Sequence, residues 1–281
     1  MDEYQTWKVQ VKSNYSFFDF DFKELIEYRD LLLIMVYRDF KASYKQTVLG
    51  PLWFFLQPLV NSFAYYFIFG KVISIDFEQY NPIHFYLTGV IFWNLFSSCT
   101  TLTSNVFISN AGIFKKVYFP RLIAPMAIIL SALMRFMIQF IFVFIVILFS
   151  GDCKIDLSLP SVFFLVFSVI ATALFGMSIG LMFANFSRKY RDLNYILSFS
   201  LQLFMFVTPI LYPISIVGSG ELELLKFNPL LHFLQSFRSF FFGDDLINMP
   251  YFIVNVLLLI SFSVYAILTY NKSSRNFVDT I

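Results

Sequence analysis

The fold of this chain is decided by residues 28–58, which read YRDLLLIMVYRDFKASYKQTVLGPLWFFLQP. The first half mixes charged and apolar residues, and the half after Gly50-Pro51 is almost entirely apolar and aromatic. The apolar run Leu31–Tyr37 has seven residues between Arg29-Asp30 and Arg38-Asp39, whereas a membrane-spanning helix needs about 20. We therefore expect a helix along the membrane surface, followed by a turn into the bilayer at Gly50-Pro51.

The surface helix is expected over residues 23–48. One helical stripe contains Leu33, Tyr37, Phe40, Tyr44 and Val48, at spacings of three or four residues. The opposite face carries the basic residues Arg38, Lys41 and Lys45. A basic amphipathic helix of this kind favours the membrane interface.

The composition indicates that the whole chain, and not only this segment, belongs to a membrane protein. Hydrophobic residues make up 58% and charged residues 14%, which is too little charge to cover the surface of a soluble domain. The apolar residues form blocks of about 20, the length that crosses a bilayer. We predict an all-α polytopic membrane protein with a transmembrane domain over residues 49–270, and the six spans are 51–70, 85–108, 122–149, 160–185, 195–213 and 250–270.

The distribution of basic residues predicts the orientation. With the N-terminus inside, fifteen of the 20 Lys and Arg residues fall in inner segments and four fall in outer loops. The positive-inside rule then places both termini in the cytoplasm. Residues 1–22 would be a cytoplasmic arm without the apolar core of a signal peptide, and residues 271–281 a cytoplasmic tail.

The connection between the fifth and sixth spans is more than a polar loop. Apolar or amphipathic stretches occur at residues 221–227 and 230–242, separated by Asn228-Pro229. We predict short re-entrant or outer-surface helices over residues 221–242, which need protein around them to satisfy their backbone groups. The alternative is an ordinary extracellular loop.

The sequence offers no catalytic or metal-binding cluster. His84 and His232 are far apart in sequence and favour positions in the aromatic belt at the membrane surface. Cys99 and Cys153 form no ligand motif. Since a phosphate-binding loop of the Walker type is also missing, an ATPase that powers this protein would be another chain.

Arg135 is the one charged residue deep in a predicted span. A buried Arg costs several kcal/mol unless it is solvated or paired. Ser131 and Gln139 lie one turn away on the same face. Arg135 either contacts a substrate phosphate from a lumen or is held by carbonyl groups at a helix contact.

Two predicted spans carry stripes of polar and aromatic residues. In the first span the stripe is Trp53, Gln57 and Asn61, and in the fifth it is Tyr195, Phe199, Gln202, Phe206 and Pro209. Aromatic faces stack on the apolar C–H surfaces of sugar rings, so the stripes favour a channel lined by both spans. Ordinary packing between helices would explain any one of these residues equally well.

The inner segment Asn110–Pro125, NAGIFKKVYFPRLIAP, lies between the second and third spans. It is short, basic and aromatic, and it favours a small helix that docks into a groove of a partner. The alternative is a plain positive-inside loop, which accounts for the basic residues but not for the Val117–Pro120 run.

Several segments together resemble the permease subunits of type-2 ABC exporters that move polysaccharides such as O-antigen, capsule and teichoic acid. The resemblance covers about residues 28–270. It is carried, in order, by RDFKASYKQTVLGPLWFFLQP (38–58), KKVYFPRLIAP (115–125), RKYRDLNYIL (188–197), FVTPILYP (206–213) and FNPLLHFLQSFRSFFF (227–242).

The resemblance implies a homodimer in the bacterial inner membrane with two copies of a separate ATPase, which would hold ATP and magnesium. The cargo would be an undecaprenyl-linked or other lipid-linked polysaccharide, most simply O-antigen, and no nucleic acid is expected as a partner. The channel residues would be Trp53, Gln57, Asn61, Arg135, Tyr195, Phe199, Gln202 and Phe206. The ATPase-coupling residues would be Arg38, Lys41, Lys45, Ile113, Lys115, Lys116, Tyr118, Phe119 and Arg121. The outer-gate residues would be Phe227, Pro229, Phe233 and Phe237.

Three other functions remain open at this point. A type-2 permease for capsule or teichoic acid would share these features. A permease for a small lipid or drug often has larger outer domains, which this chain lacks. A membrane glycan-modifying enzyme would need polar residues clustered at one membrane face, and Arg135 is the only such residue in a span.

Overall fold

The computed structural model describes residues 22–45, 47–77, 80–114, 116–117, 119–150, 155–187, 192–218, 225–243 and 248–276, together with residues 190, 220 and 223. Every regular element in these ranges is a helix. The α-helices are α1 (Phe22–Glu27), α2 (Arg29–Ala42), α3 (Trp53–Tyr65), α4 (Pro82–Ser104), α5 (Val106–Phe114), α6 (Ile123–Ser150), α7 (Leu159–Ser187), α8 (Leu193–Val207), α10 (Pro229–Phe242) and α11 (Met249–Asn276). The shorter elements are the 3₁₀ helices η1 (Gly50–Leu52) and η3 (Ile214–Ile216) and the π-helix η2 (Tyr66–Val72).

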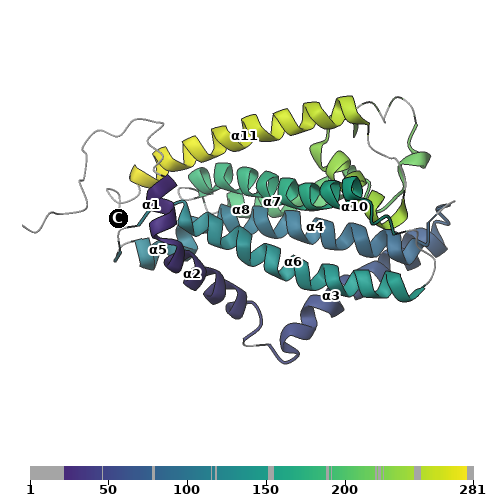
Figure 1. Ribbon diagram of the computed structural model, residues 1–281, viewed down its shortest axis with the longest axis horizontal. Coiled ribbons are helices and arrows are strands. Elements are labelled where there is room, and N and C mark those ends of the chain that lie inside the picture. The colour runs from purple at the N-terminus through teal and green to yellow at the C-terminus, as the bar shows by residue number, and fades with distance from the viewer. Residues whose placement is uncertain are drawn as a thin grey trace, which may run out of the picture.

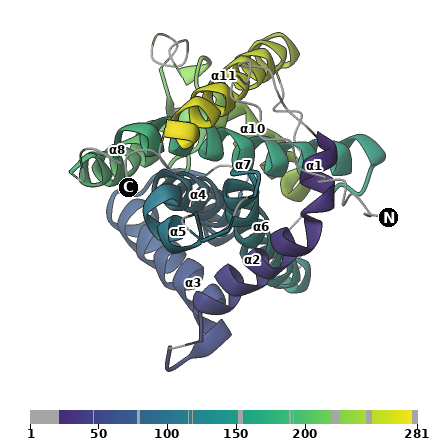
Figure 2. The same cartoon turned by 90° about the vertical axis from the view of Figure 1, so that its left-hand side faces the viewer.

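The long helices run side by side along the molecule, with α1, α2 and α5 at one end and α10 toward the other (Figure 1). We call these the α2–α5 end and the α10 end. Viewed from the α2–α5 end, α4 lies in the middle of the bundle (Figure 2). It packs against α3, α6, α7 and α8, and 16 of its 23 residues are buried. The core of the protein is therefore built around α4.

Four helical stretches are long and apolar enough to cross a membrane. They are Gly50–Val72, Ile123–Ser150, Leu159–Ser187 and Met249–Ser273. They coincide with the first, third, fourth and sixth predicted spans. The second and fifth predicted spans correspond to α4, which is largely enclosed by other helices, and to α8, which has 15 residues.

Asn-Pro pairs start two of the helices. The side chain of Asn81 accepts a hydrogen bond from the backbone N–H of Ile83 at the start of α4, and Asn228 accepts one from Leu230 at the start of α10. In both cases proline is the first helical residue, where its missing N–H costs nothing. The helix α10 ends at Gly243, whose φ of 70° is the left-handed conformation that glycine adopts without strain.

The surface helix differs from the prediction in extent and in the face that packs. It is divided at Tyr28 into α1 and α2 and ends at Ala42 rather than at residue 48. The buried residues of α2 are Met35 and Val36, which pack toward α6, whereas Leu33 and Tyr37 of the predicted stripe are exposed. The helix therefore has two apolar faces. The periodicity identified the one on which Leu33 and Tyr37 stay exposed, while Phe40 of the same stripe packs against Phe54.

Other helix ends also differ from the prediction. The second predicted span continues to residue 108, but α4 ends at Ser104 and α5 starts after Asn105. The fifth continues to residue 213, but α8 ends at Val207 because Thr208 precedes Pro209 and takes an extended conformation. The sixth helix runs on to Asn276, beyond the predicted end at residue 270. The predicted arm and tail lie outside the described residues at positions 1–21 and 277–281.

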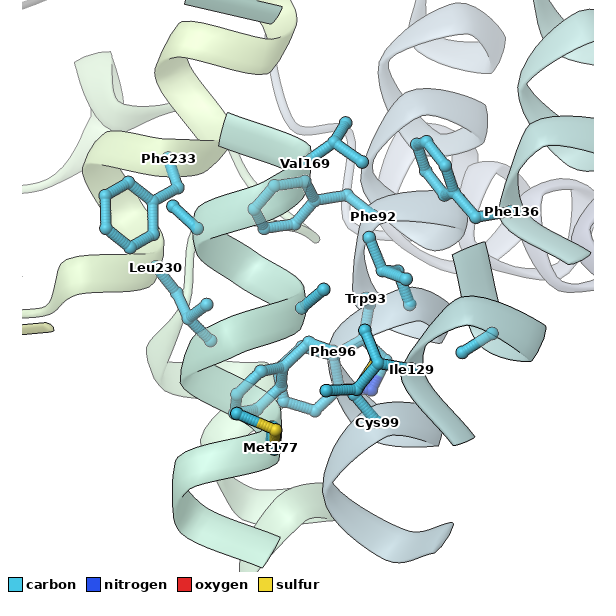
Figure 3. Packing of buried hydrophobic residues seen from close by; sticks show 14 of the residues in the cluster. Phe92, Trp93, Phe96, Cys99, Ile129, Phe136, Val169, Met177, Leu230 and Phe233 are labelled. Carbon is cyan, nitrogen blue, oxygen red and sulfur yellow. The ribbon is translucent and has the colours of Figure 1, made fainter. Parts of the chain in front are cut away.

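Helices α4 and α7 pack closely against each other, and Figure 3 shows side chains of both in the core. A Cβ atom on Gly180 would lie 2.6 Å from the carbonyl oxygen of Thr100, and one on Gly176 would lie 2.8 Å from that of Phe96. The two glycines are four residues apart and share one face of α7. Small residues at this spacing let helix backbones approach closely within a membrane.

Candidate functional site

The chain changes direction between α2 and α3 (Figure 1). Gly50 has a φ of 55°, a conformation that glycine adopts at little cost, and Pro51 follows at the start of η1. The chain thus turns at Gly50-Pro51, and entry into the bilayer at this turn stays a prediction. Phe54, the second residue of α3, stacks on Phe40 with ring centroids 6.0 Å apart and meets Tyr44 edge-on at 6.3 Å. These rings fix the angle between the two helices.

A cavity of about 210 Å³ lies where α3, α4 and α6 meet. Five polar side chains and four apolar ones surround it. The lining residues are Phe54, Gln57, Asn94, Leu95, Ser98, Ala132, Arg135, Phe136 and Gln139. The structure therefore brings together two of the predicted channel residues, Gln57 and Arg135, with the polar neighbour Gln139, and it adds Asn94 and Ser98, which sequence reasoning missed.

The four predicted channel residues of α8 share an uncovered face of that helix. Tyr195 is 81% exposed, Phe199 62% and Phe206 53%, and Gln202 is also exposed. The opposite side of α8 buries Leu197 and Leu201. The predicted stripe is therefore a real helical face, and most of it is left exposed by the described residues.

The predicted channel residues thus form two groups. Gln57 and Arg135 line the cavity between α3, α4 and α6, whereas the α8 residues lie on an exposed helix face. Trp53, on α3, is 45% exposed. Helices α3 and α8 lie on the same side of α4 (Figure 2), and the hydroxyl of Tyr65 contacts the sulfur of Met205 at 3.8 Å. Asn61 lies at the edge of the exposed face of α3, partly buried.

At the α2–α5 end, one side chain connects the surface helix to α5. A guanidinium nitrogen of Arg38 donates to the amide oxygen of Asn110 at 2.9 Å and lies 2.7 Å from the carboxylate of Asp39. Asn110 is buried and donates in turn to the carbonyl of Val106. Arg38 was predicted as a coupling residue, but its partner Asn110 was not.

The rest of the predicted coupling segment is held firmly against the bundle. Phe107 stacks on Tyr270 of α11 with centroids 5.0 Å apart, and Phe114 stacks on Phe119 at 5.5 Å. Phe119 is therefore buried rather than available to a partner, and Ile113 is partly buried. The exposed apolar residues here are Ile108 and Val117, which the prediction did not single out.

The other predicted coupling residues lie around this contact. Arg121 lies over the ring of Phe114 at 5.6 Å, and its carbonyl accepts a hydrogen bond from Tyr270. Lys45 and Lys116 are exposed, and Lys41 is partly exposed over the ring of Tyr37. Lys115 and Tyr118 lie outside the described residues.

The predicted outer-gate residues do not share one environment. Phe233 and Phe237 are fully buried, Pro229 starts α10 and Phe227 is 64% exposed. The expected belt positions of the histidines are wrong, because His84 and His232 are both buried. Burial lowers the pKa of His232, and its bond to the Lys226 carbonyl opposes that shift.

Arg238 was assigned to an outer loop, yet it is almost completely buried in α10. It donates to the carbonyls of Pro209, Phe85 and Ile210 at 2.8, 3.2 and 3.3 Å. Its guanidinium lies 3.6 Å from the centre of the Phe85 ring. The one signal in the sequence was a single Arg within an otherwise apolar amphipathic stretch.

Comparison with known proteins identifies the family. The chain is 29% identical to an O-antigen export system permease protein RfbA of Klebsiella pneumoniae, over 86% of this chain and 93% of the relative. It is 27% identical to RfbA of Myxococcus xanthus, over 80% and 85% of the two chains. The polysialic acid transport protein KpsM of Escherichia coli is 23% identical over 72% and 77%. Residues 30–242 match the ABC-2 type transporter family, and the chain therefore belongs to that family.

Proposed function

We propose that two copies of this chain form the membrane channel of an ATP-driven exporter for a lipid-linked polysaccharide, most simply O-antigen. Family membership makes the chain a transporter subunit rather than an enzyme. The observation that carries the proposal is the similarity to O-antigen export permeases over 86% of the chain. A separate ATPase would bind ATP and magnesium and drive the export. The similarity to the polysialic acid transport protein makes a capsule polymer the second candidate cargo.

The proposed arrangement in the membrane has six spans, with α4 and α8 joining the four apolar stretches. The central position of α4 supports its inclusion, because a helix surrounded by other helices needs less apolar surface than one facing lipid. The excess of basic residues in the α2–α5 half supports a cytoplasmic location for both termini. The membrane would be the bacterial inner membrane, where lipid-linked glycans are assembled. Helix α10 and the segment before it would form the outer gate.

The cargo is tested by deleting the gene in its host and fractionating the cell glycans. We expect polymer that is still attached to its lipid carrier to accumulate on the cytoplasmic side, because assembly continues while export stops. Chemical analysis of that polymer would identify the substrate. Loss of all polymer would instead point to a synthetic enzyme, and unchanged surface polymer would favour a small lipid or drug as cargo.

The uncovered face of α8 supports a channel between two chains. Tyr195, Phe199 and Phe206 present aromatic rings that are more than half exposed. Helix α3, which also carries exposed residues, reaches α8 through the contact between Tyr65 and Met205. A second copy placed against these helices would enclose the rings in a lumen. Rigid aromatic faces suit a passing sugar chain because they stack on it without fixing its register.

Replacing Tyr195 and Phe199 together by alanine is expected to lower export about tenfold, since each aromatic contact is worth about 0.5–1.5 kcal/mol. The matched control is Phe163→Ala, because Phe163 on α7 is 63% exposed and Phe199 is 62% exposed. Surface polymer and chain abundance would be measured in cells that carry each variant. Equal export by the double variant and the control, at equal abundance, would remove α8 from the channel.

The contact between Arg38 and Asn110 supports a coupling role for the α2–α5 end. Replacing Arg38 with alanine removes a charged hydrogen bond between α2 and α5, worth about 1.5–3 kcal/mol. We expect the ATPase to bind and hydrolyse ATP while export per ATP falls several-fold. Arg29→Ala is the control, because Arg29 is on the same helix but pairs at 3.8 Å with Asp30 at an exposed site. Unchanged export per ATP in Arg38→Ala would contradict this role.

A further inference from the structure

The cavity between α3, α4 and α6 contains a cation without an anionic partner in its lining. Arg135 lies within α6, and one of its terminal nitrogens is buried without a hydrogen-bond partner among the described residues. Neither aspartate nor glutamate occurs among the described residues that line the cavity. Asp39 acts on Arg135 electrostatically, but its carboxylate lies 2.7 Å from Arg38. The lining of the cavity itself therefore supplies no negative charge to Arg135.

An uncompensated guanidinium within a membrane protein is costly, and such residues mark binding sites for ions or substrates. Water fills part of such a space, since 210 Å³ is many times the ~10–15 Å³ that one water needs. Water supplies no negative charge, however. An anion that entered the cavity would interact with Arg135 more strongly than in bulk water, because the surrounding protein has a lower dielectric.

The lining residues fit one class of anion. The guanidinium fork matches the oxygen atoms of a phosphate group. The amides of Gln57, Asn94 and Gln139 and the hydroxyl of Ser98 add neutral hydrogen-bond donors around it. Phe54, Leu95 and Phe136 form apolar walls. A polar group that carries a hydrocarbon chain would satisfy both kinds of surface.

The position of the cavity indicates that this group comes from a lipid. Gln57 lies four residues after Trp53, or about 6 Å along α3 from the start of that helix, which lies part-way along the bundle (Figure 1). Arg135 lies twelve residues after Ile123, or about 18 Å along α6 from the α2–α5 end. The Phe54 ring at the cavity edge contacts Phe40 and Tyr44 of the surface segment. The cavity thus adjoins the segment that is predicted to lie along the membrane surface, where the lipid headgroups of one leaflet would be within reach.

We propose that this cavity binds the phosphate group of a membrane lipid from the inner leaflet, with Arg135 as the anion-binding residue. Gln57, Asn94 and Gln139 would orient the phosphate oxygens. The site is separate from the exposed α8 face, because no α8 residue lines it. The choice of a carrier lipid over a bulk phospholipid rests on the proposed function, whereas the phosphate site itself does not.

The test is thermal unfolding of the full-length chain in neutral detergent, with undecaprenyl phosphate, phosphatidylglycerol or inorganic phosphate added separately. Replacing Arg135 with methionine should leave the lipid-free protein folded and at least as stable, because an apolar residue of similar size removes a buried charge. At a hundredfold excess over the dissociation constant, a phosphate lipid should raise the unfolding temperature of the unsubstituted chain by about 5 °C. Arg135→Met should lose that rise. Lys71→Met, which removes an exposed charge at the far end of the same span as Gln57, should keep it.

The added compounds separate the possible sources of phosphate. A rise with undecaprenyl phosphate alone supports a carrier-lipid site, and equal rises with both lipids support a general phospholipid site. A rise with inorganic phosphate as well supports phosphate recognition without a chain requirement. Equal rises in the unsubstituted chain and Arg135→Met, or no rise with any compound, would overturn the proposal. If a phosphate lipid raises the unfolding temperature but gene deletion leaves the surface glycan unchanged, the phosphate site is supported and the proposed export function is contradicted.

Discussion

Replacing Gly180 with leucine is expected to abolish accumulation of folded protein. A Cβ atom at this position would lie 2.6 Å from the carbonyl oxygen of Thr100, 2.8 Å from the Cβ of Thr103 and 3.1 Å from the backbone nitrogen of Ser104. Two of these three atoms belong to the backbone of α4, so no rotation of a side chain can relieve the clash. The two helices at the centre of the bundle would have to move apart.

Overpacking by small additions already costs about 1–3 kcal/mol, and leucine adds four carbon atoms at this contact. Since whole proteins are stable by only about 5–15 kcal/mol, the effect should exceed what the chain tolerates. Gly112→Leu is the matched control, because nothing lies within 4 Å of a Cβ at Gly112. Yield of monodisperse protein extracted from membranes measures both variants. Normal yield of Gly180→Leu would show that α4 and α7 do not pack as closely as this structure has them.

The importance of Gly180 illustrates what the sequence carries and what it does not. The four-residue spacing of Gly176 and Gly180 is visible in the sequence and signals a close helix contact. Which helix makes that contact depends on the arrangement of six or more helices, and no local pattern encodes it. In the same way, the lengths of apolar blocks predicted the positions of the long helices, while the central place of α4 emerged only from their packing.

The surface helix shows the same limit on a smaller scale. Its periodicity identified a stripe through Leu33 and Tyr37, and this stripe is a true helical face. The face that packs on α6 instead contains Met35 and Val36. A helix with apolar residues on two sides gives no sequence signal for which side faces protein, because lipid and protein interiors are equally apolar.

The predicted channel residues fall into two separate groups for a related reason. Periodicity placed Arg135 and Gln139 on one face of α6, and placed Tyr195 and Phe199 on one face of α8. It could not show that the first pair would meet Gln57 around one cavity while the second would lie on an exposed helix face. The packing of helices that are distant in the sequence decides which residues meet around a cavity, and it also decides the surroundings of Arg238.

Replacing Arg238 with leucine is expected to destabilise the α10 end by about 3 kcal/mol, lowering the unfolding temperature by about 10 °C. The loss leaves the carbonyls of Pro209 and Ile210 without the donor that they share. Both carbonyls follow the end of α8, where the helix no longer supplies partners. Arg238→Lys should recover only part of the loss, because one ammonium group cannot reproduce the guanidinium geometry. Thermal unfolding of the purified variants measures the series.

A second substitution tests whether Arg238 acts through these contacts. A Cβ atom at Gly89 would lie 2.7 Å from a terminal nitrogen of Arg238, so Gly89→Ala should displace the guanidinium and destabilise the protein by a related route. Once Arg238 is leucine, that nitrogen is gone, and the alanine at position 89 should cost less. The double variant should therefore be more stable than the sum of the single losses predicts, by at least about 0.5 kcal/mol. Strict additivity would mean that Gly89 is kept for its approach to Ile210, whose side chain and carbonyl lie 3.0 and 3.2 Å from the same Cβ position, and not for Arg238.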